Sequence, residues 1–141
     1  MQLDQVDHIG VLTADADATG AVFEAMGGPI VWDNHIDEHN ARVVFIEFGD
    51  VYVELLEPTG PGIVQDHYDD HGGGFEHVAY RVEDIDAAVE YFREQGYTFE
   101  TDDTRAGAGH SRIIYFDRDD TDDLAIELVE LLPEDVRYAS D

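Results

Sequence analysis

Apolar and polar positions follow one another along the chain in a pattern that predicts short strands and two longer helices. Residues 6–12 and 77–82 are short apolar segments typical of strands. Over residues 85–95, apolar side chains recur at positions i, i+3, i+4 and i+7, as on one face of a helix. The other expected elements are a helix over 17–26 and strands over 30–34, 42–48, 51–56, 98–101, 112–117 and 124–131.

Aspartates and glycines mark the ends of these elements. An Asp-rich segment precedes each helix, and Gly27 and Gly96 follow the two helices directly. The sequence Phe48-Gly49-Asp50-Val51 predicts a tight hairpin between two strands. A further short helix is expected over residues 63–71, ahead of three consecutive glycines at 72–74.

The two halves of the chain repeat one another, which is the most informative feature of the sequence. At an offset of 69 residues, His8 aligns with His77, and five further identical pairs follow within 20 residues. These pairs are Asp15/Asp84, Asp17/Asp86, Ala18/Ala87, Phe23/Phe92 and Gly27/Gly96. Residues 42–45 match 112–115, and residues 53–57 match 126–130. We therefore predict one α+β domain over 1–141, in which linker 59–73 joins modules 4–58 and 74–132, each of order βαβββ.

The charge balance is extreme and bears on partners. The chain has 34 acidic residues against seven arginines and no lysine, for a formal net charge of −27, and the acidic residues are spread along its length. A uniformly acidic coat on a globular core indicates adaptation to high salt, where self-repulsion is screened. We therefore expect a halophilic, cytoplasmic protein. Nucleic acid is a poor partner because few cations are present to neutralise phosphates.

Several classes of protein are excluded by what the sequence lacks. Apolar residues make up 43% of the chain, but no apolar run approaches the ~18 residues that a membrane span needs. The first residues lack the basic and apolar regions of a secretory signal. Cysteine is absent, so disulfides, thiolate metal sites and a cysteine nucleophile are excluded.

Four residues at matched positions of the repeat are candidates for a metal site. His8 and His77 lie on the first strands of the two modules, and Glu54 and Glu127 lie on the last strands. If the modules pair about a pseudo-twofold axis, two imidazoles and two carboxylates meet, a set that suits a divalent transition metal. Taken singly, each histidine also fits a hydrogen-bonded core position and each glutamate a solvent-facing one. From the residues alone both interpretations stay open.

The other histidines are weaker candidates. His35 and His39, like His67 and His71, are spaced to chelate zinc from one face of a helix. Neither pair is duplicated in the repeat, and both lie in exposed acidic stretches, which favours solvated surface histidines. His110 follows a Gly/Ala-rich segment, residues 105–109, that reads either as a plain turn or as a lid that touches an anionic ligand.

Several stretches of the chain resemble a known superfamily. They are residues 6–11, 53–58, 74–80, 107–109, 112–113 and 126–128. At these positions the sequence resembles the vicinal oxygen chelate (glyoxalase/bleomycin-resistance) superfamily and, within it, the methylmalonyl-CoA epimerases, over about residues 6–130. The resemblance implies a cupped, mostly antiparallel sheet made of two βαβββ modules around a metal, and a homodimer.

The resemblance also implies a ligand set. His8, His77 and Glu127 match metal ligands of the epimerases, and Glu54 occupies a position filled by Gln or Glu. The implied cofactor is a divalent metal ion, namely Co, Ni, Zn, Mn or Fe. Val43 stands where some epimerases carry a catalytic Glu, and Asp117-Arg118 replaces the usual His-Pro.

The implied chemistry is removal of a proton from the carbon next to the thioester carbonyl of an acyl-CoA. Glu127 is expected to serve as one acid–base group, with Glu54 or Glu47 as the second. Arg105 and Arg112 are the expected anchors for the coenzyme A phosphates. The alternatives are a glyoxalase I-like lyase acting on a thiol adduct, an iron dioxygenase using His8, His77 and Glu127, and a non-catalytic binding protein.

Overall fold

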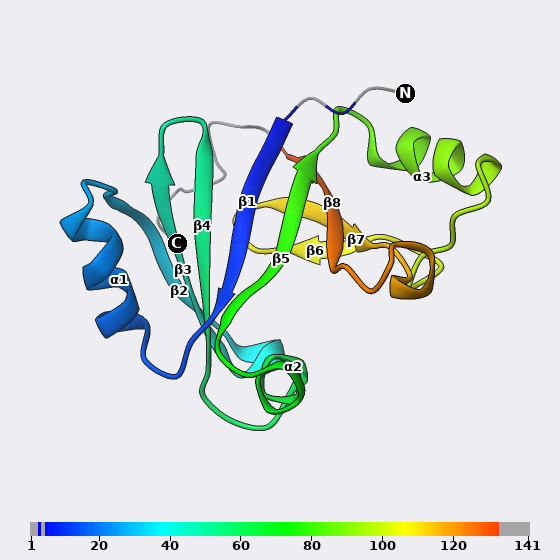
Figure 1. Cartoon of the computed structure of the whole chain (residues 1–141). Helices are drawn as coiled ribbons and strands as arrows, with labels where there is room; N and C mark the ends of the chain where they lie inside the picture. The colour runs from blue at the N-terminus through cyan, green and yellow to red at the C-terminus, as the bar shows by residue number, and fades with distance from the viewer. Residues whose placement is uncertain (1–2, 4, 133–141) are drawn as a thin grey trace. The chain divides into compact units, whose positions relative to one another are not determined.

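The structure is a computed structural model and describes residue 3 and residues 5–132. Within these residues the repeat appears as two successions of strand, helix and three strands (Figure 1). The first comprises β1 (Gln5–Leu12), α1 (Ala16–Ala25), β2 (Ile30–Ile36), β3 (Ala41–Phe48) and β4 (Val51–Pro58). The second comprises β5 (Gly74–Arg81), α3 (Ile85–Glu94), β6 (Arg105–Gly107), β7 (Ser111–Tyr115) and β8 (Ile126–Leu131). The 3-10 helices are η1 (Asp37–His39) and η2 (Arg118–Asp120), and α2 (Ile63–His71) links the two successions.

The chain divides into two compact units. One is His8–Glu76, and the other contains residues 5–7 and 77–132 of the described chain. In the first unit the strands run in the order β2-β3-β4-β1, and in the second in the order β5-β8-β7-β6. The pairs β1·β4 and β5·β8 are parallel, and the other named pairs are antiparallel. The predicted mostly antiparallel fold of two βαβββ modules is therefore confirmed. Residues 1–2, 4 and 133–141, which belong to the predicted domain, lie outside the described residues.

The helices α1 and α3 each pack on one face of their strands and define a core there. In the first unit that core contains Val11, Val44, Ile46, Val53 and Leu55 with Ala16 of α1. In the second unit it contains Ile114, Phe116 and Leu128 with Ile85, Ala88 and Val89 of α3. Because side chains alternate along a strand, the residues between these core positions face away from the helix. This alternation gives each set of strands a helix-packed face and an opposite face.

The helix ends repeat as the sequence predicts. Asp15 and Asp84 accept hydrogen bonds from the backbone N–H groups of Ala18 and Ala87, at 3.0 and 3.1 Å. Such N-caps satisfy amides that have no partner within the helix. After the helices, Gly27 and Gly96 adopt φ of 98° and 96°, a left-handed conformation that favours glycine.

One expected strand is wrong. Residues 98–101 form no strand but a single bridge between Phe99 and Phe116. The strand lies instead at β6, within residues 105–109, for which the sequence alone predicts a plain turn or a lid. There Arg105 pairs with Ile113 in a hairpin whose turn residues Gly109 and His110 both have positive φ. The sequence Arg-Ala-Gly has poor strand propensity, so it does not predict a strand here. Residues 105–107 form one because they pair with β7.

Candidate metal centre

Buried polar and charged residues are few in the described part of the chain, and all four predicted ligands are among them. They are Asp7, His8, Thr13, Glu54, His77, Ser111 and Glu127. A buried carboxylate is costly to desolvate unless it is paired or binds a metal. Burial therefore argues against solvent-facing positions for Glu54 and Glu127.

In the first unit, His8 and Glu54 come together from neighbouring strands. His8 lies on β1 and Glu54 on β4, both on the face opposite α1, and His8 Nε2 lies 3.4 Å from Glu54 Oε1. The ring of Phe45 packs edge-on against the His8 ring at a centroid distance of 5.6 Å. Phe45 also lies directly opposite Glu54 in the β3·β4 register. Packing of this kind limits the rotamers of the imidazole.

In the second unit, His77 and Glu127 have the same surroundings. His77 lies on β5 and Glu127 on β8, where Glu127 pairs with Tyr115 in the β7·β8 register. The Tyr115 ring packs edge-on against His77, again at 5.6 Å. The constellation of histidine, aromatic residue and glutamate is thus built twice, with Phe45 and Tyr115 at equivalent positions. These aromatics were not among the predicted site residues, although the alignment of residues 42–45 with 112–115 already paired them.

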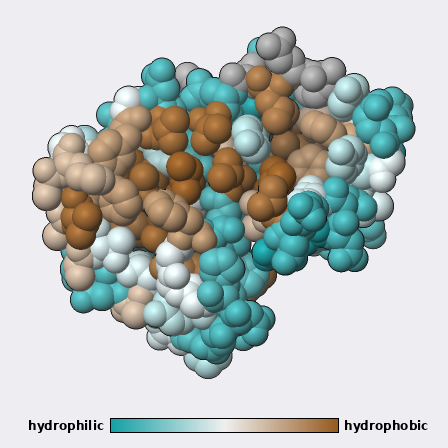
Figure 2. All heavy atoms as spheres, viewed as in Figure 1, coloured by the Kyte–Doolittle hydropathy of each residue, from teal (hydrophilic) through white to brown (hydrophobic). Residues whose placement is uncertain are grey.

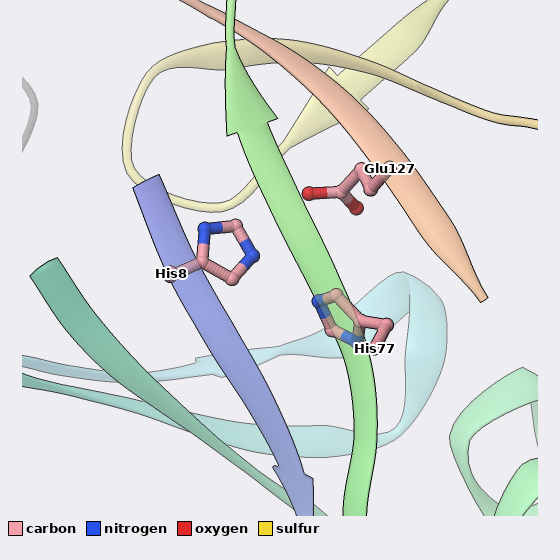
Figure 3. A group of neighbouring side chains, drawn as sticks. All are labelled: His8, His77 and Glu127. Carbon is pink, nitrogen blue, oxygen red and sulfur yellow. The ribbon is translucent and has the colours of Figure 1, made fainter. Parts of the chain in front are cut away.

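His8, His77 and Glu127 form a group that could hold a metal ion. All three residues are buried, and Figure 3 shows their side chains. Two imidazoles and a carboxylate form a nitrogen and oxygen donor set of the kind that first-row transition metals take. The donor chemistry therefore fits the divalent ion that the sequence predicts, without distinguishing Co, Ni, Zn, Mn or Fe.

Strand alternation places Glu47 on the face that carries the first set of ligands. Glu47 lies two residues after Phe45 on β3, opposite Tyr52 of β4. The Tyr52 hydroxyl donates a hydrogen bond of 3.5 Å to Glu47 Oε2. Val43, on the same face, is buried and supplies no acid–base group.

The two predicted anchors, Arg105 and Arg112, differ in their contacts. Arg112 precedes Ile114 by two residues and shares its helix-packed face, where its guanidinium pairs with Asp86 of α3 at 3.0 Å. This hydrogen bond raises the pKa of Arg112. Arg105 lies on β6 opposite Ile113, and its guanidinium carbon is 5.9 Å from the centroid of the Tyr115 ring. Arg105, but not Arg112, therefore lies beside an aromatic residue that contacts His77.

The sequence did not predict an ion pair that involves Asp7, the residue before His8. Asp7 is completely buried, and its Oδ1 accepts hydrogen bonds from Nε and Nη2 of Arg81 at 3.1 and 2.8 Å. The repeat gave no signal for this pair, because the equivalent positions carry Glu76 and Leu12.

The remaining histidines have surface positions. His35 is exposed and contacts Asp37 and Thr59 through its two ring nitrogens, both at 2.7 Å. His67, His71 and His110 are exposed as well. Within the described residues, the histidines of the group that could hold a metal ion are therefore His8 and His77.

Comparison with known proteins gives the family. Residues 7–116 match the model of the Glyoxalase/Bleomycin resistance protein/Dioxygenase superfamily. The chain belongs to this superfamily. Its curated relatives within the superfamily include the mitochondrial methylmalonyl-CoA epimerase of Mus musculus, 26% identical over 90% of this chain and 73% of that protein. The ethylmalonyl-CoA/methylmalonyl-CoA epimerase of Cereibacter sphaeroides is 25% identical over 92% of this chain and 99% of that protein.

A solved member of the superfamily has the same fold. It is a methylmalonyl-CoA epimerase in complex with methylmalonyl-CoA and NH4+, 28% identical, with a TM-score of 0.85 over 94% of this chain and 97% of that chain. The family resemblance inferred from the sequence is thereby confirmed. In the present chain, no helix among the described residues is long and apolar enough to span a membrane.

Proposed function

We propose that this protein is a metal-dependent epimerase of methylmalonyl-CoA. The observation that carries the proposal is the duplicated, buried constellation of histidine and glutamate, in a chain whose relatives are named methylmalonyl-CoA epimerases. Epimerisation inverts one carbon and therefore needs an acid–base group for each of its two sides. A duplicated site supplies two carboxylates of similar surroundings.

His8, Glu54, His77 and Glu127 are the proposed ligands of the metal. Their charges would neutralise a divalent cation, since both imidazoles bind as neutral ligands and both carboxylates are anionic. When bound, the ion supplies Lewis-acid stabilisation of the negative charge that develops on the thioester oxygen. Phe45 and Tyr115 hold the two imidazoles by edge-on packing.

Proton transfer is assigned to the glutamates. One carboxylate oxygen, on Glu127 in our proposal, takes the proton as the C2–H bond breaks, and the electron pair of that bond delocalises onto the thioester carbonyl. The second group, Glu47 or Glu54 after it has taken up a proton from solvent, then gives that proton to the other side of C2. A positioned carboxylate contributes about 10²–10⁴-fold to such a step.

The substrate class is supported by the relatives. The solved relative holds methylmalonyl-CoA, and most of the named curated relatives are methylmalonyl-CoA epimerases. A homodimer, a cytoplasmic location and adaptation to high salt stay predictions. The glyoxalase I-like and dioxygenase alternatives also stay predictions, and none of the relatives described above is named as either enzyme.

The test is a proton-exchange measurement by NMR in D₂O, with metal-loaded protein in molar KCl. We expect enzyme-dependent loss of the C2 proton of methylmalonyl-CoA, and loss of this exchange when a chelator is added. The chelator should also lower the thermal midpoint, because a ligand at ~100 times its Kd stabilises the native state by about 2.7 kcal/mol. Folded, metal-loaded protein that catalyses no exchange would overturn the proposal, and hemithioacetals would then be tested as substrates.

A further inference from the structure

Strand alternation places Arg105 and Arg112 of the second unit on opposite faces of the strands. Ile114 and Leu128 pack toward α3, and Arg112 shares their face. Tyr115 and Glu127 lie directly opposite each other on the other face, which also carries His77. Arg105 pairs with Ile113, two residues before Tyr115, and therefore lies on the face of Tyr115 and Glu127.

The other described arginines are mostly occupied by carboxylates. Arg42 forms ion pairs with Asp17 and Asp33, and Arg81 with Asp7. Arg112 pairs with Asp86, and Arg118 with Asp123. Arg93 donates to the backbone oxygen of Asp102. For Arg105 the contact that the structure shows is the face of the Tyr115 ring, although the chain carries 34 acidic residues. A guanidinium held over an aromatic ring keeps its donor edge available for a planar anion.

The first unit has no equivalent cation. Asn34 of β2 faces Val43, which is the repeat counterpart of Ile113, so Asn34 occupies the position of Arg105. The aromatic that contacts histidine is Phe45 there and Tyr115 here. The duplicated constellation thus differs at two neighbouring positions: near His77 a phenol replaces a phenyl ring, and a guanidinium replaces an amide.

We propose that Arg105 binds the carboxylate of the acyl group, and so selects carboxyl-bearing thioesters over plain acyl thioesters. This inference rests on the proposed function and names the part of the substrate that Arg105 recognises. In methylmalonyl-CoA the carboxylate is attached to the reacting carbon itself, whereas the phosphates lie at the far end of the pantetheine arm. Arg105 lies one aromatic ring away from His77, which matches the nearer anion. Its charge also offsets the repulsion between an anionic substrate and so acidic a protein.

The experiment compares Arg105→Gln with wild-type protein on methylmalonyl-CoA and on methylmalonyl-pantetheine, which lacks the nucleotide phosphates. Loss of a charge-assisted hydrogen bond raises KM by about 10- to 100-fold. We expect this increase with both thioesters, and partial rescue in Arg105→Lys. The control is Arg118→Gln, which removes the same charge from an arginine that pairs with Asp123. An increase confined to the full coenzyme A thioester would assign Arg105 to the phosphates, and no increase with either would leave it without a role; both overturn the proposal.

A binding measurement separates this inference from the proposed activity. By calorimetry, metal-loaded wild-type protein should bind methylmalonyl-pantetheine more tightly than propionyl-pantetheine, and Arg105→Gln should lose that preference. If the wild type shows the preference but catalyses no exchange, the epimerase proposal fails and the role of Arg105 stands. If the wild type shows no preference, or Arg105→Gln retains it, the role of Arg105 is wrong.

Discussion

The first and second modules hold their buried histidines in the same way but treat the neighbouring positions differently. His8 packs against Phe45, and His77 packs against Tyr115, at the same centroid distance of 5.6 Å. Beside Tyr115 the second module adds a cation, Arg105. A duplicated module can keep its ligand positions equal and still diverge around them. In our proposals, both modules supply metal ligands, whereas the second module alone recognises the substrate anion.

The surfaces of the two helices differ as well. Val22 on α1 and Met26, which directly follows the helix, are 59% and 60% exposed, and the side that carries α1 is tan and brown in Figure 2. At the equivalent positions of the second module, Tyr91 is half-buried and Gln95 is polar. The two helices therefore share their caps and their place in the fold but not their outer surface.

The largest expected effect comes from removing the carboxylates that the two modules share. We predict that the double variant Glu54→Gln/Glu127→Gln loses activity and keeps its fold, because each carboxylate is worth about 10²–10⁴-fold in proton transfer. Each single variant should retain exchange from one epimer of the substrate better than net inversion. Exchange and inversion are followed separately by NMR, with circular dichroism as the check on folding. Turnover retained by the double variant would remove both residues from the mechanism.

The next largest effect tests a difference between the modules, the Asp7–Arg81 pair. Arg81→Leu places in the second module the residue type that the first has at Leu12, and it leaves the Asp7 carboxylate without its arginine. Breaking a buried pair from one side costs about 3–5 kcal/mol. Urea denaturation at constant KCl measures the cost. The double variant Asp7→Asn/Arg81→Leu should recover part of it, and a cost below about 1 kcal/mol for Arg81→Leu would show that the pair contributes little.

A smaller effect is expected where the modules are alike in a helix contact. Glu57 Oε1 accepts from the backbone N–H of Ala16 at 2.7 Å, and Glu130 Oε1 accepts from that of Ile85 at 2.9 Å. Glu57→Gln and Glu130→Gln should each reduce the free energy of unfolding by about 1–2 kcal/mol. The two costs should agree closely. A large difference between them, measured by chemical denaturation, would contradict an equivalent role in the two modules.

The smallest effect concerns the surface ion pairs that tie each helix to its strands. Arg42 pairs with Asp17 and Arg112 with Asp86, which are equivalent pairs of the repeat. Arg42→Gln and Arg112→Gln should each cost less than about 1 kcal/mol, and less in molar KCl than in dilute buffer. The wild type itself should gain stability as KCl is raised, because salt screens its net charge of −27. Thermal unfolding across a salt series tests both expectations, and a wild type insensitive to salt would contradict the halophilic prediction.

Much of the fold could be predicted because its signals are local. The hydrophobic spacing over 85–95 gave α3 to within one residue, and 63–71 coincides with α2. Gly49, with φ of 58°, forms the predicted hairpin between Phe48 and Val51. The prediction of a strand over 98–101 was wrong because the residues around Phe99 have a higher strand propensity than Arg-Ala-Gly at 105–107. Residues 105–107 form a strand only because they pair with β7.

The site divides in the same way. The repeat by itself selected His8, Glu54, His77 and Glu127, because matched positions in two modules limit chance agreement. The repeat did not predict the Asp7–Arg81 pair, because its partners are 74 residues apart and the pair has no counterpart in the other module.

The sequence by itself therefore determined the duplicated module, its caps and turns, and the choice of the four residues that we propose as metal ligands. These depend on short-range periodicity and on a comparison of the chain with itself. Only the tertiary structure decided that Arg105 lies beside the ring on His77 while Arg112 pairs with a helix. The physical reason is that a strand's register decides which face each side chain takes, and register is fixed by pairing between residues distant in sequence.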